Sequence, residues 1–415
     1  MNRATSTLAC RACGTPLVHS FVDLGETPLA NAFPREQDLD RPDPRYPLHA
    51  RVCGECFLVQ VEAVVPPEEL FSDYAYFSSY SESWVEHARR FADTARTRFD
   101  IGPDSWVVEV ASNDGYLLRH FAAAGVPVLG IEPAANVAAA AEKAGVPTLV
   151  RFFGRALGEE LAAGGKSADL VVGNNVLAHV PELDDFVAGL AALVKPDGVI
   201  SLEFPHLLRL IEGVQFDTIY HEHVSYLSLL AVERIFARNG LRVVDVEPLP
   251  THGGSLRVLA CRENSAAHAS GPGLAAVRAE ERAAGLDRIE SYTGFAERVA
   301  AVKESLLAFL DRARRDGKAV VAYGAAAKGN TLLNVCGVGP ELIDFVVDAS
   351  PHKQGRYTPG ARLPIYGPER LIEARPDYVL ILPWNLRDEI VDEMHEVRSW
   401  GGRFVVPIPK TEVLP

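Results

Sequence analysis

The stretch "WVVEVASNDGYLLRHF", residues 106–121, joins an apolar run to a helical pattern through a turn of small and polar residues. The run "WVVEV" predicts a strand, and "YLLRHF" predicts the helix that follows it. A turn of small residues lets that helix begin close to a ligand, with free backbone N–H groups pointing toward the ligand. The stretch therefore predicts the first strand, turn and helix of an α/β domain that binds a small molecule.

The same alternation of strand and helix patterns continues on both sides of this stretch, over residues 101–265. It predicts a largely parallel, doubly wound sheet. Residues 266–316 are rich in Ala, Glu and Arg with helical periodicity, and a second α/β pattern starts at Lys318. We therefore predict three parts: a zinc-binding module over 1–66, a cofactor-binding domain over 67–265, and a helical connector with a C-terminal α/β domain over 266–415.

Composition limits the possible partners of the chain. It holds 41 basic and 55 acidic residues, a net charge of −14, so there is no general attraction to nucleic acid or to anionic membranes. The start "MNRATSTLACRACG" lacks the apolar core of a signal peptide, and no apolar run is long enough to span a membrane. We expect a cytoplasmic protein with reduced thiols and no nucleic-acid or membrane partner.

Four of the six cysteines form two Cys-x-x-Cys pairs, "CRAC" with Cys10 and Cys13, and "CGEC" with Cys53 and Cys56. Each pair can turn two thiolates toward one cation, and two pairs complete a tetrahedral shell of sulfur. The 39 residues between the pairs include "FVDLGETPLANAFP" and "YPLHARVC", which we expect to form connecting strands. With no open coordination position, the predicted zinc ion is structural. A redox role of the pairs is the alternative.

An acidic residue follows the second predicted strand of the central domain. Glu132, in "GIEP", lies 23 residues after Glu109, where a carboxylate can hold the ribose hydroxyls of an adenosine. This position fits either NAD or S-adenosylmethionine. The succession "ADLVVGNNVLAHVPELDDF" and "LVKPDGVISLEFP" resembles class I methyltransferases, and so favours S-adenosylmethionine. Where such enzymes carry Glu-x-Gly-x-Gly, this chain has "EVASNDG", residues 109–115.

Taken together, the motifs of the chain resemble the sugar C-methyltransferases of antibiotic deoxysugar biosynthesis, which methylate C3 of a nucleotide-linked 4-keto sugar. The resemblance runs almost end to end and rests on the cysteine pairs and on "DYAYFSSYS", "EVASNDGYLL", "GIEP", "NNVLAHVP", "FDTIYHEHVSYLS", "THGGSLR" and "YGAAAKGNTLLN". It implies a dTDP-4-keto-deoxysugar as the acceptor. A monomer is one possible state of the protein, and the sequence leaves the oligomeric state open. The donor-binding residues that it implies are Glu109, Ala111, Asn113, Asp114, Gly115, Glu132, Pro133, Asn174 and Asn175.

The chemistry of this family explains "FDTIYHEHVSYLS", residues 216–228. A ketone at C4 acidifies the hydrogen at C3, so a base can form an enolate that takes the methyl group. The reaction needs a base, a donor to the oxygen anion, and a group that fixes the base's tautomer. We predict His223 as the base, with Tyr220 and Glu222 in the other roles. His179, at the end of the fourth strand, is the alternative base.

Several regions are candidates for binding the acceptor. "THGGSLR" offers Ser255 and Arg257, "YGAAAKGN" offers Lys328 and Asn330 at a predicted helix start, and "LPWNLRDE" offers Asn385. We expect the turn with Lys328 to hold the diphosphate, although it lacks the Lys-Ser/Thr end of a P-loop. Near the start of the central domain, before its first predicted strand, Tyr74 is predicted with the catalytic group and Tyr76 with the acceptor-binding group, both as lid residues.

Two other functions compete with C-methylation. A nicotinamide-dependent oxidoreductase would use the glycine-containing turn of the last domain, with Asp348 as its ribose acceptor. That reading leaves the first α/β domain without a role. A zinc-knuckle, RNA-modifying methyltransferase is disfavoured because the chain is acidic and shows no basic stripe.

Overall fold

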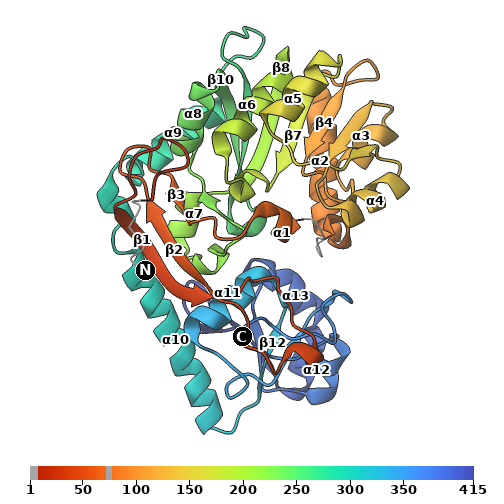
Figure 1. Cartoon of the computed structure of the whole chain (residues 1–415). Coiled ribbons are helices and arrows are strands. Elements are labelled where there is room, and N and C mark those ends of the chain that lie inside the picture. Colours follow the sequence, from red (N-terminus) through yellow and green to blue (C-terminus); the bar gives the residue numbers. More distant parts are fainter. Residues whose placement is uncertain (1–7, 72–76) are drawn as a thin grey trace.

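The computed structural model describes residues 8–71 and 77–415, which form two lobes joined along one side (Figure 1). The upper lobe in that view contains a seven-stranded sheet, and the lower lobe contains a six-stranded sheet. Two elements lie along the joined side. One is a four-stranded sheet built mainly by the N-terminal part, and the other is the long helix α10 (Phe295–Arg315). Among the described residues, every helix is too short or too polar to cross a membrane.

The seven-stranded sheet has the strand order β10-β11-β8-β7-β4-β5-β6. Counted along the chain from β4, its five parallel strands stand in the order 3-2-1-4-5 of a doubly wound sheet, and β11 and β10 add an antiparallel pair at one edge. The strands are β4 (Val107–Val110), β5 (Val128–Ile131), β6 (Thr148–Leu149), β7 (Ala168–Asn174), β8 (Val194–Pro205), β10 (Leu241–Leu249) and β11 (Ser255–Arg262).

Alternate side chains of the central strands pack on opposite faces of this sheet. Val108 and Val110 of β4 belong to one buried core, and Val107 belongs to another. Helices on both faces exclude water, which explains why the three valines of the strand serve two cores and why Glu109 between them is fully buried. The helices of this lobe are α2 (Glu82–Arg98), α3 (Leu118–Ala123), α4 (Ala135–Lys143), α5 (Arg155–Ala163), α6 (Leu183–Leu193), α7 (Leu207–Glu212), α8 (Leu229–Arg238) and α9 (Pro272–Ala283).

The N-terminal sheet is antiparallel and has the order β1-β2-β3-β9. The two segments expected between the cysteine pairs form β1 (His19–Thr27) and β2 (Tyr46–Val52), and β3 (Val59–Gln60) follows the second pair. The fourth strand, β9 (Ser225–Tyr226), comes from the "FDTIYHEHVSYLS" stretch. That stretch is therefore hydrogen-bonded into the N-terminal sheet. A short helix, α1 (Pro67–Phe71), follows this module.

The six-stranded sheet of the lower lobe has the order β14-β13-β12-β15-β16-β17. Counted from β12 this is 3-2-1-4-5-6, the order of a dinucleotide-binding sheet, with only the last strand antiparallel. Its strands are β12 (Val320–Tyr323), β13 (Val346–Val347), β14 (Ile365–Tyr366), β15 (Tyr378–Ile381), β16 (Arg403–Val406) and β17 (Glu412–Val413). Its helices are α11 (Ala327–Cys336), α12 (Glu369–Ala374) and α13 (Arg387–Glu393).

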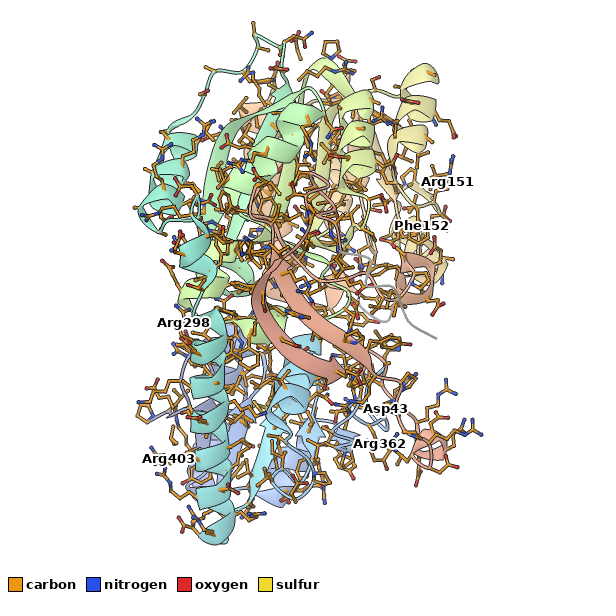
Figure 2. All side chains as sticks on the ribbon, turned by 60° about the vertical axis from the view of Figure 1, so that its left-hand side comes forward. Asp43, Arg151, Phe152, Arg298, Arg362 and Arg403 are labelled. Carbon is orange, nitrogen blue, oxygen red and sulfur yellow. The ribbon has the colours of Figure 1, made fainter. Side chains whose placement is uncertain are left out.

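One hydrophobic core joins the two lobes. Phe21 of β1, Phe216 of the "FDTIYHEHVSYLS" stretch and Leu306 of α10 all belong to it, together with strands of the lower sheet. Polar contacts reinforce this junction. Figure 2 shows Asp43, in the chain between β1 and β2, beside Arg362 of the lower lobe, and the two side chains form an ion pair of 3.1 Å. The N-terminal module is thus packed against both lobes.

These observations confirm the predicted fold class: a four-cysteine module, a doubly wound central domain and a C-terminal α/β domain. The turn after β4 has three residues with positive φ, Ala111 (56°), Asn113 (49°) and Gly115 (76°). Asn and Gly adopt this conformation readily, but the Cβ of alanine makes it unfavourable. Ala111 is therefore a strained position in a turn that otherwise has suitable residues.

We expect Ala111→Gly to raise the free energy of unfolding by about 1 kcal/mol, because glycine removes the steric cost of the left-handed conformation. Thermal or denaturant unfolding measures the change. Ala139→Gly is the matched control: Ala139 is an exposed residue inside α4, where glycine should lower stability by about 1 kcal/mol. Destabilisation by both substitutions would contradict the assignment of strain at Ala111.

Candidate active site

The two cysteine pairs meet in space as the sequence predicts. The sulfur atoms of Cys10, Cys13, Cys53 and Cys56 all lie within 4.8 Å of one another, and three of the four residues are buried. Gln60 donates from Nε2 to the sulfur of Cys10 at 3.1 Å, a contact that favours a thiolate. Four sulfur donors with no open position fit a structural zinc ion. The group packs against the core that also holds α5, α6 and α8, so it stabilises the module rather than the reaction centre.

Donor pocket

All nine predicted donor-binding residues lie at the carboxyl ends of β4, β5 and β7, the edge where parallel doubly wound sheets bind ligands. Glu132, after β5, accepts the backbone N–H of Asn113 at 3.0 Å. It also accepts the backbone N–H of Ala134, the residue after Pro133, at 2.9 Å. Burial raises the pKa of this carboxyl group. Glu132 therefore joins the turn after β4 to the turn after β5.

The rest of this edge supplies polar atoms without protein partners. One carboxylate oxygen of Asp114 and the side-chain oxygens of Asn174 and Asn175 are buried and have no hydrogen-bond partner within the described residues. Glu109 is fully buried on β4, and burial raises the pKa of its carboxyl group well above the ordinary value. Free acceptors beside a small-residue turn fit the amino and hydroxyl groups of S-adenosylmethionine.

Gly115 ends the turn and is needed for its packing. A Cβ atom at this position would lie 2.9 Å from a methyl carbon of Val146, and the residue has a φ of 76°. A larger residue would therefore push the turn away from Val146, which lies between α4 and β6. The Ser79 backbone N–H donates to Asp114 at 3.0 Å, and the Ser78 N–H donates to the Asn113 side chain at 2.8 Å. The segment before α2 thus packs directly on the donor turn.

Base cluster

His223 has a defined tautomer. Its Nδ1 lies 3.0 Å from the carbonyl oxygen of Thr218, which can only accept a hydrogen bond, so Nδ1 carries the hydrogen. The lone pair is then on Nε2, which lies 2.8 Å from the hydroxyl of Tyr220. Burial, with the neighbouring His179, holds the pKa of His223 well below its ordinary value. A neutral imidazole at pH 7 is available as a base.

His179 lies beside this pair. The rings of His179 and His223 meet edge to face, with centroids 4.6 Å apart. Nδ1 of His179 donates to the backbone carbonyl of Glu222 at 2.8 Å, so its Nε2 also carries a lone pair. Burial lowers the pKa of His179 to about 4. The structure therefore brings both candidate bases together, each neutral and each with a lone pair on Nε2, and that of His223 accepts from the Tyr220 hydroxyl.

Glu222 points to the N-terminal module. Its carboxylate accepts from Nδ2 of Asn31 at 2.7 Å, and burial raises its pKa to about 7. The contact that fixes the tautomer of His223 comes from the backbone carbonyl of Thr218, whereas the Glu222 carboxylate bonds to Asn31. Sequence reasoning missed both Thr218 and Asn31. Thr218 lies inside the quoted motif, whereas nothing in "GETPLANAFP" marks Asn31 as a partner of Glu222.

The other two residues of the motif have structural contacts. His221 is buried, and its Nε2 lies 3.3 Å from the carbonyl oxygen of Tyr46. Tyr226 donates from its hydroxyl to the carbonyl oxygen of His223 at 2.8 Å and belongs to β9. The predicted lid residues Tyr74 and Tyr76 lie outside the described residues.

Acceptor side

Two of the predicted acceptor-binding residues meet at the carboxyl ends of β12 and β15. Nζ of Lys328 donates to the side-chain oxygen of Asn385 and lies 4.8 Å from the centre of the Trp384 ring. Trp384 in turn donates from Nε1 to Asp217 at 2.7 Å. Asp217 lies in the turn Phe216–Thr218, just before the base, and sequence reasoning did not select it.

The other three predicted acceptor residues are bonded to the protein itself. Ser255 donates to the carbonyl oxygen of Thr251 at 2.9 Å, and Asn330 donates to that of Ala30 at 2.7 Å. Arg257 lies in a buried network. Their roles toward the acceptor stay predictions, because the structure does not bring them to the Lys328 group.

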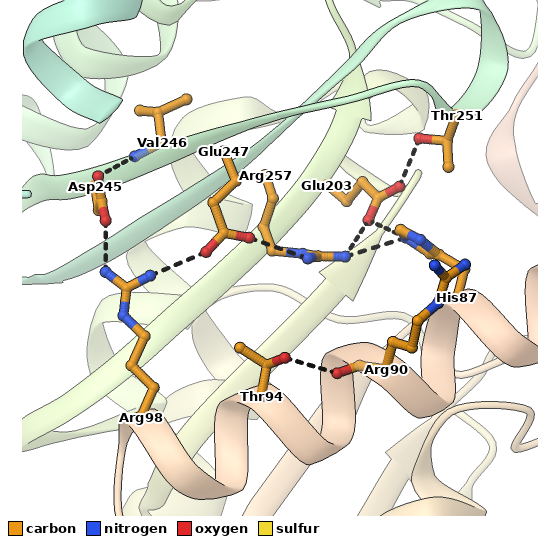
Figure 3. A network of polar contacts seen from close by, with 10 residues as sticks. All are labelled: His87, Arg90, Thr94, Arg98, Glu203, Asp245, Val246, Glu247, Thr251 and Arg257. Atoms are coloured by element: carbon orange, nitrogen blue, oxygen red, sulfur yellow. Dashed lines mark hydrogen bonds and ion pairs between the residues drawn. The ribbon is translucent and has the colours of Figure 1, made fainter. Parts of the chain in front are cut away.

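Figure 3 shows the network that contains Arg257. Its guanidinium pairs with Glu203 at 2.8 Å and with Glu247 at 3.2 Å. His87 also contacts Glu203 at 2.8 Å, and Thr251 donates to the other oxygen at 2.9 Å. Burial alone would raise the pKa of Glu203, but the His87 hydrogen bond and the Arg257 charge hold it below its ordinary value. The network fastens α2 and the "THGG" turn to the end of β8.

Comparisons with known proteins

Three family models match successive parts of the chain. Residues 10–71 match a "Putative zinc binding domain", residues 84–246 match a "Methyltransferase domain", and residues 250–409 match a "C-methyltransferase C-terminal domain". The zinc model covers the four cysteines that the structure brings together.

Known proteins are similar to the chain over different lengths. "C-methyltransferase NovU" of Streptomyces niveus is 39% identical over 405 residues, which cover 98% of this chain and 96% of that protein. A ubiquinone biosynthesis O-methyltransferase of Methylobacterium sp. (strain 4-46) is 35% identical over 186 residues, 40% of this chain and 74% of that protein. Among solved structures, a magnesium protoporphyrin IX methyltransferase from Synechocystis PCC 6803 with bound S-adenosylmethionine shows 18% identity and a TM-score of 0.33, covering 44% of this chain and 82% of its own.

We expect about one equivalent of zinc per chain, measured by elemental analysis of purified protein, because four thiolates form one closed shell. Cys10→Ser should lose the metal and impair folding, since the ion links both pairs. Cys261→Ser is the control: this cysteine is buried in β11 outside the group, and its replacement should leave the zinc content unchanged. A folded, fully active protein without zinc would contradict the structural role.

Proposed function

Because the chain belongs to the C-methyltransferase family that includes NovU, we propose that its acceptor is a dTDP-linked 4-keto-deoxysugar, which it methylates at C3. The protein is an S-adenosylmethionine-dependent C-methyltransferase with a zinc-binding module. That class leaves no role for the nicotinamide alternative. The proposed acceptor is supported above all by the base cluster, in which two neutral imidazoles and a tyrosine hydroxyl meet close to the end of β7.

The base cluster supplies what enolate formation needs. In the structure, the Tyr220 hydroxyl donates to Nε2 of His223. A hydroxyl hydrogen can rotate, so a bound ketone oxygen can take that hydrogen bond and free the Nε2 lone pair. We propose that Nε2 then removes the C3 proton, while Tyr220 donates to the oxygen anion that develops at C4. Bound S-adenosylmethionine supplies the electrophilic methyl group that the C3 carbon takes in an in-line displacement.

Burial of the cluster assists this step. Both histidines are neutral because burial lowers their pKa, so neither has to lose a proton before the acceptor binds. In a site with little water, a fixed donor stabilises an oxygen anion more strongly than it would in solution. Thr218 holds the His223 ring in one orientation, which keeps Nε2 directed to one place.

The lower lobe has features that suit the nucleotide of the acceptor. Asp348, after β13, accepts the backbone N–H of Ala325 at 2.7 Å and that of Ser350 at 2.8 Å. Glu132 makes an equivalent pair of contacts in the upper sheet. It accepts one N–H from the turn after the first strand, β4, and one from the residue two positions after itself. We propose that the dTDP group lies along the carboxyl ends of β12 and β13, with its sugar directed to His223.

Glu132→Ala should weaken binding of S-adenosylhomocysteine by about 1–3 kcal/mol, because a charge-assisted hydrogen bond to the ribose is lost. Titration calorimetry measures the change. Asp348→Ala is the matched control, since it removes the same backbone contacts from the other sheet. It should leave affinity for S-adenosylhomocysteine unchanged and weaken binding of dTDP. Equal losses of S-adenosylhomocysteine affinity in the two variants would mean that the carboxylates act only on stability.

His223→Asn should lower turnover by about 10²–10⁴-fold while both ligands still bind, because the general base is lost. It should also slow deuterium exchange at C3 with S-adenosylhomocysteine in place of the donor, since exchange needs the base but no methyl group. Mass spectrometry and NMR follow the label. His221→Asn, at a histidine bonded to Tyr46, should leave exchange unchanged.

Two outcomes would revise this assignment. Exchange that survives in His223→Asn and disappears in His179→Asn would make His179 the base and His223 a positioning residue. Deuterium at C5 instead of C3 would move the methyl group to the other carbon beside the ketone, because the ketone acidifies both neighbours. Each result identifies a different error, one in the base and one in the orientation of the sugar.

A further inference from the structure

Asp217 is a buried carboxylate with an unused oxygen. Its side chain is fully buried in the turn Phe216–Thr218, and Oδ2 accepts from Nε1 of Trp384 at 2.7 Å. Oδ1 is buried without a hydrogen-bond partner among the residues that the structure describes. An unpaired carboxylate oxygen in such a position is costly, so it marks a place where a bound molecule can supply the missing donor.

Lys328 contacts the same tryptophan as Asp217, because its Nζ lies 4.8 Å from the centre of the Trp384 ring. Its ammonium group has three donors, and the one hydrogen bond found for it in the described part of the chain goes to Asn385. Lys328 and Asp217 form no direct ion pair, yet each acts on the other's pKa through space. Lys328 also acts on His223 and His252 in this way, which places its charge close to the base.

These two groups select for one kind of ligand atom. A phosphate would be attracted by Lys328 but repelled by the carboxylate of Asp217. A protonated amine would be attracted by Asp217 but repelled by Lys328. A hydroxyl group can donate to Oδ1 of Asp217 and accept from Nζ of Lys328 at the same time. We propose that Asp217 and Lys328 form a subsite for a hydroxyl group of the acceptor's sugar ring, so that Lys328 binds the sugar and not the diphosphate. The inference rests on the proposed function.

Neighbouring residues hold the subsite in place. A Cβ atom at Gly253 would lie 2.5 Å from the Trp384 ring, so the indole packs closely on the "THGG" turn. Gln215 donates to the carbonyl oxygen of Gly253 at 2.8 Å. Thr218, the next residue after Asp217, holds the ring of His223. A hydroxyl bound at Asp217 would therefore set the position of the sugar ring relative to the base.

The test compares acceptors that differ by one hydroxyl group. We would measure kcat and KM for two pairs of dTDP-4-keto-deoxysugars. The members of the first pair differ by the presence or absence of a hydroxyl group at C2. The members of the second pair carry either a hydroxyl or an amino group at C3. The wild-type enzyme should prefer the hydroxylated member of one pair by at least about 10-fold in kcat/KM, because a site built for a hydroxyl group rejects an analogue without it. Asp217→Asn still accepts from Trp384 but loses the charge, and it should abolish that preference.

Trp384→Phe is the matched control. It removes the contact to Oδ2 and leaves Oδ1 unchanged, so it should reduce activity equally with both members of the pair. Titration with S-adenosylhomocysteine reports whether each variant is folded and binds donor. Equal loss with both acceptors in Asp217→Asn, or a wild-type enzyme that prefers the hydroxylated member of neither pair, would overturn the inference. Failure of the wild-type enzyme to methylate every one of these sugars, with donor binding intact, would instead overturn the proposed function.

Discussion

The segment between Val214 and Tyr226 is buried where three parts of the protein meet, and the proposed chemistry depends on that burial. Phe216 and Ile219 are fully buried in a core that includes β1, α10 and strands of the lower sheet. Such a position removes water from the backbone and side chains of the segment, so each polar group needs a protein partner or a ligand. The Thr218 carbonyl accepts a hydrogen bond from His223. The Glu222 carboxylate accepts one from Asn31, and the Asp217 carboxylate accepts one from Trp384. Among the residues that the structure describes, Oδ1 of Asp217, Nδ1 of His221 and Oγ of Ser225 are the buried side-chain atoms of this segment without a hydrogen-bond partner.

The same burial sets the protonation states of the groups. Desolvation disfavours charge, which lowers the pKa of His179 and His223 and raises that of Glu222 and Asp217, to about 7 and about 6. The bases are therefore unprotonated, and the charge of Lys328 adds to the lowering of the His223 pKa. A site arranged in this way opposes formation of an imidazolium ion unless negative charge appears beside it. An enolate oxygen supplies that charge, so proton transfer and its stabilisation are coupled.

The two sheets use one device at their ligand-binding edges. A carboxylate after the second strand accepts N–H groups from the turn after the first strand and from the residue two positions further on, as Glu132 and Asp348 show. Hydrogen bonds to a carboxylate are stronger than neutral ones, so the carboxylate holds the two turns together before any ligand binds. Both turns lie beside the point where the strand order reverses, where open α/β sheets bind ligands.

Local pattern determined a large part of this protein. The alternation of apolar and helical segments predicted both doubly wound sheets, because side-chain periodicity follows from backbone geometry and needs no distant contact. The two Cys-x-x-Cys pairs predicted the four-sulfur group for the same reason. The turn after β4 and Glu132 after β5 were predicted from their places at the carboxyl ends of strands, whereas the full set of predicted donor-binding residues came from the family resemblance.

Tertiary structure alone decided which polar groups meet. Arg257 follows a glycine turn, as a phosphate-binding residue would, but strand pairing places Glu203 of β8 and Glu247 of β10 opposite it as carboxylate partners. Asn31 and Glu222 are 191 positions apart along the chain, and Asp217 and Trp384 are 167 positions apart. No local sequence pattern relates the members of either pair. These contacts exist because a shared core brings the N-terminal hairpin, the "FDTIYHEHVSYLS" stretch and the lower sheet together. Sequence determined where each element begins and what each can bind, and burial between domains determined which side chains pair.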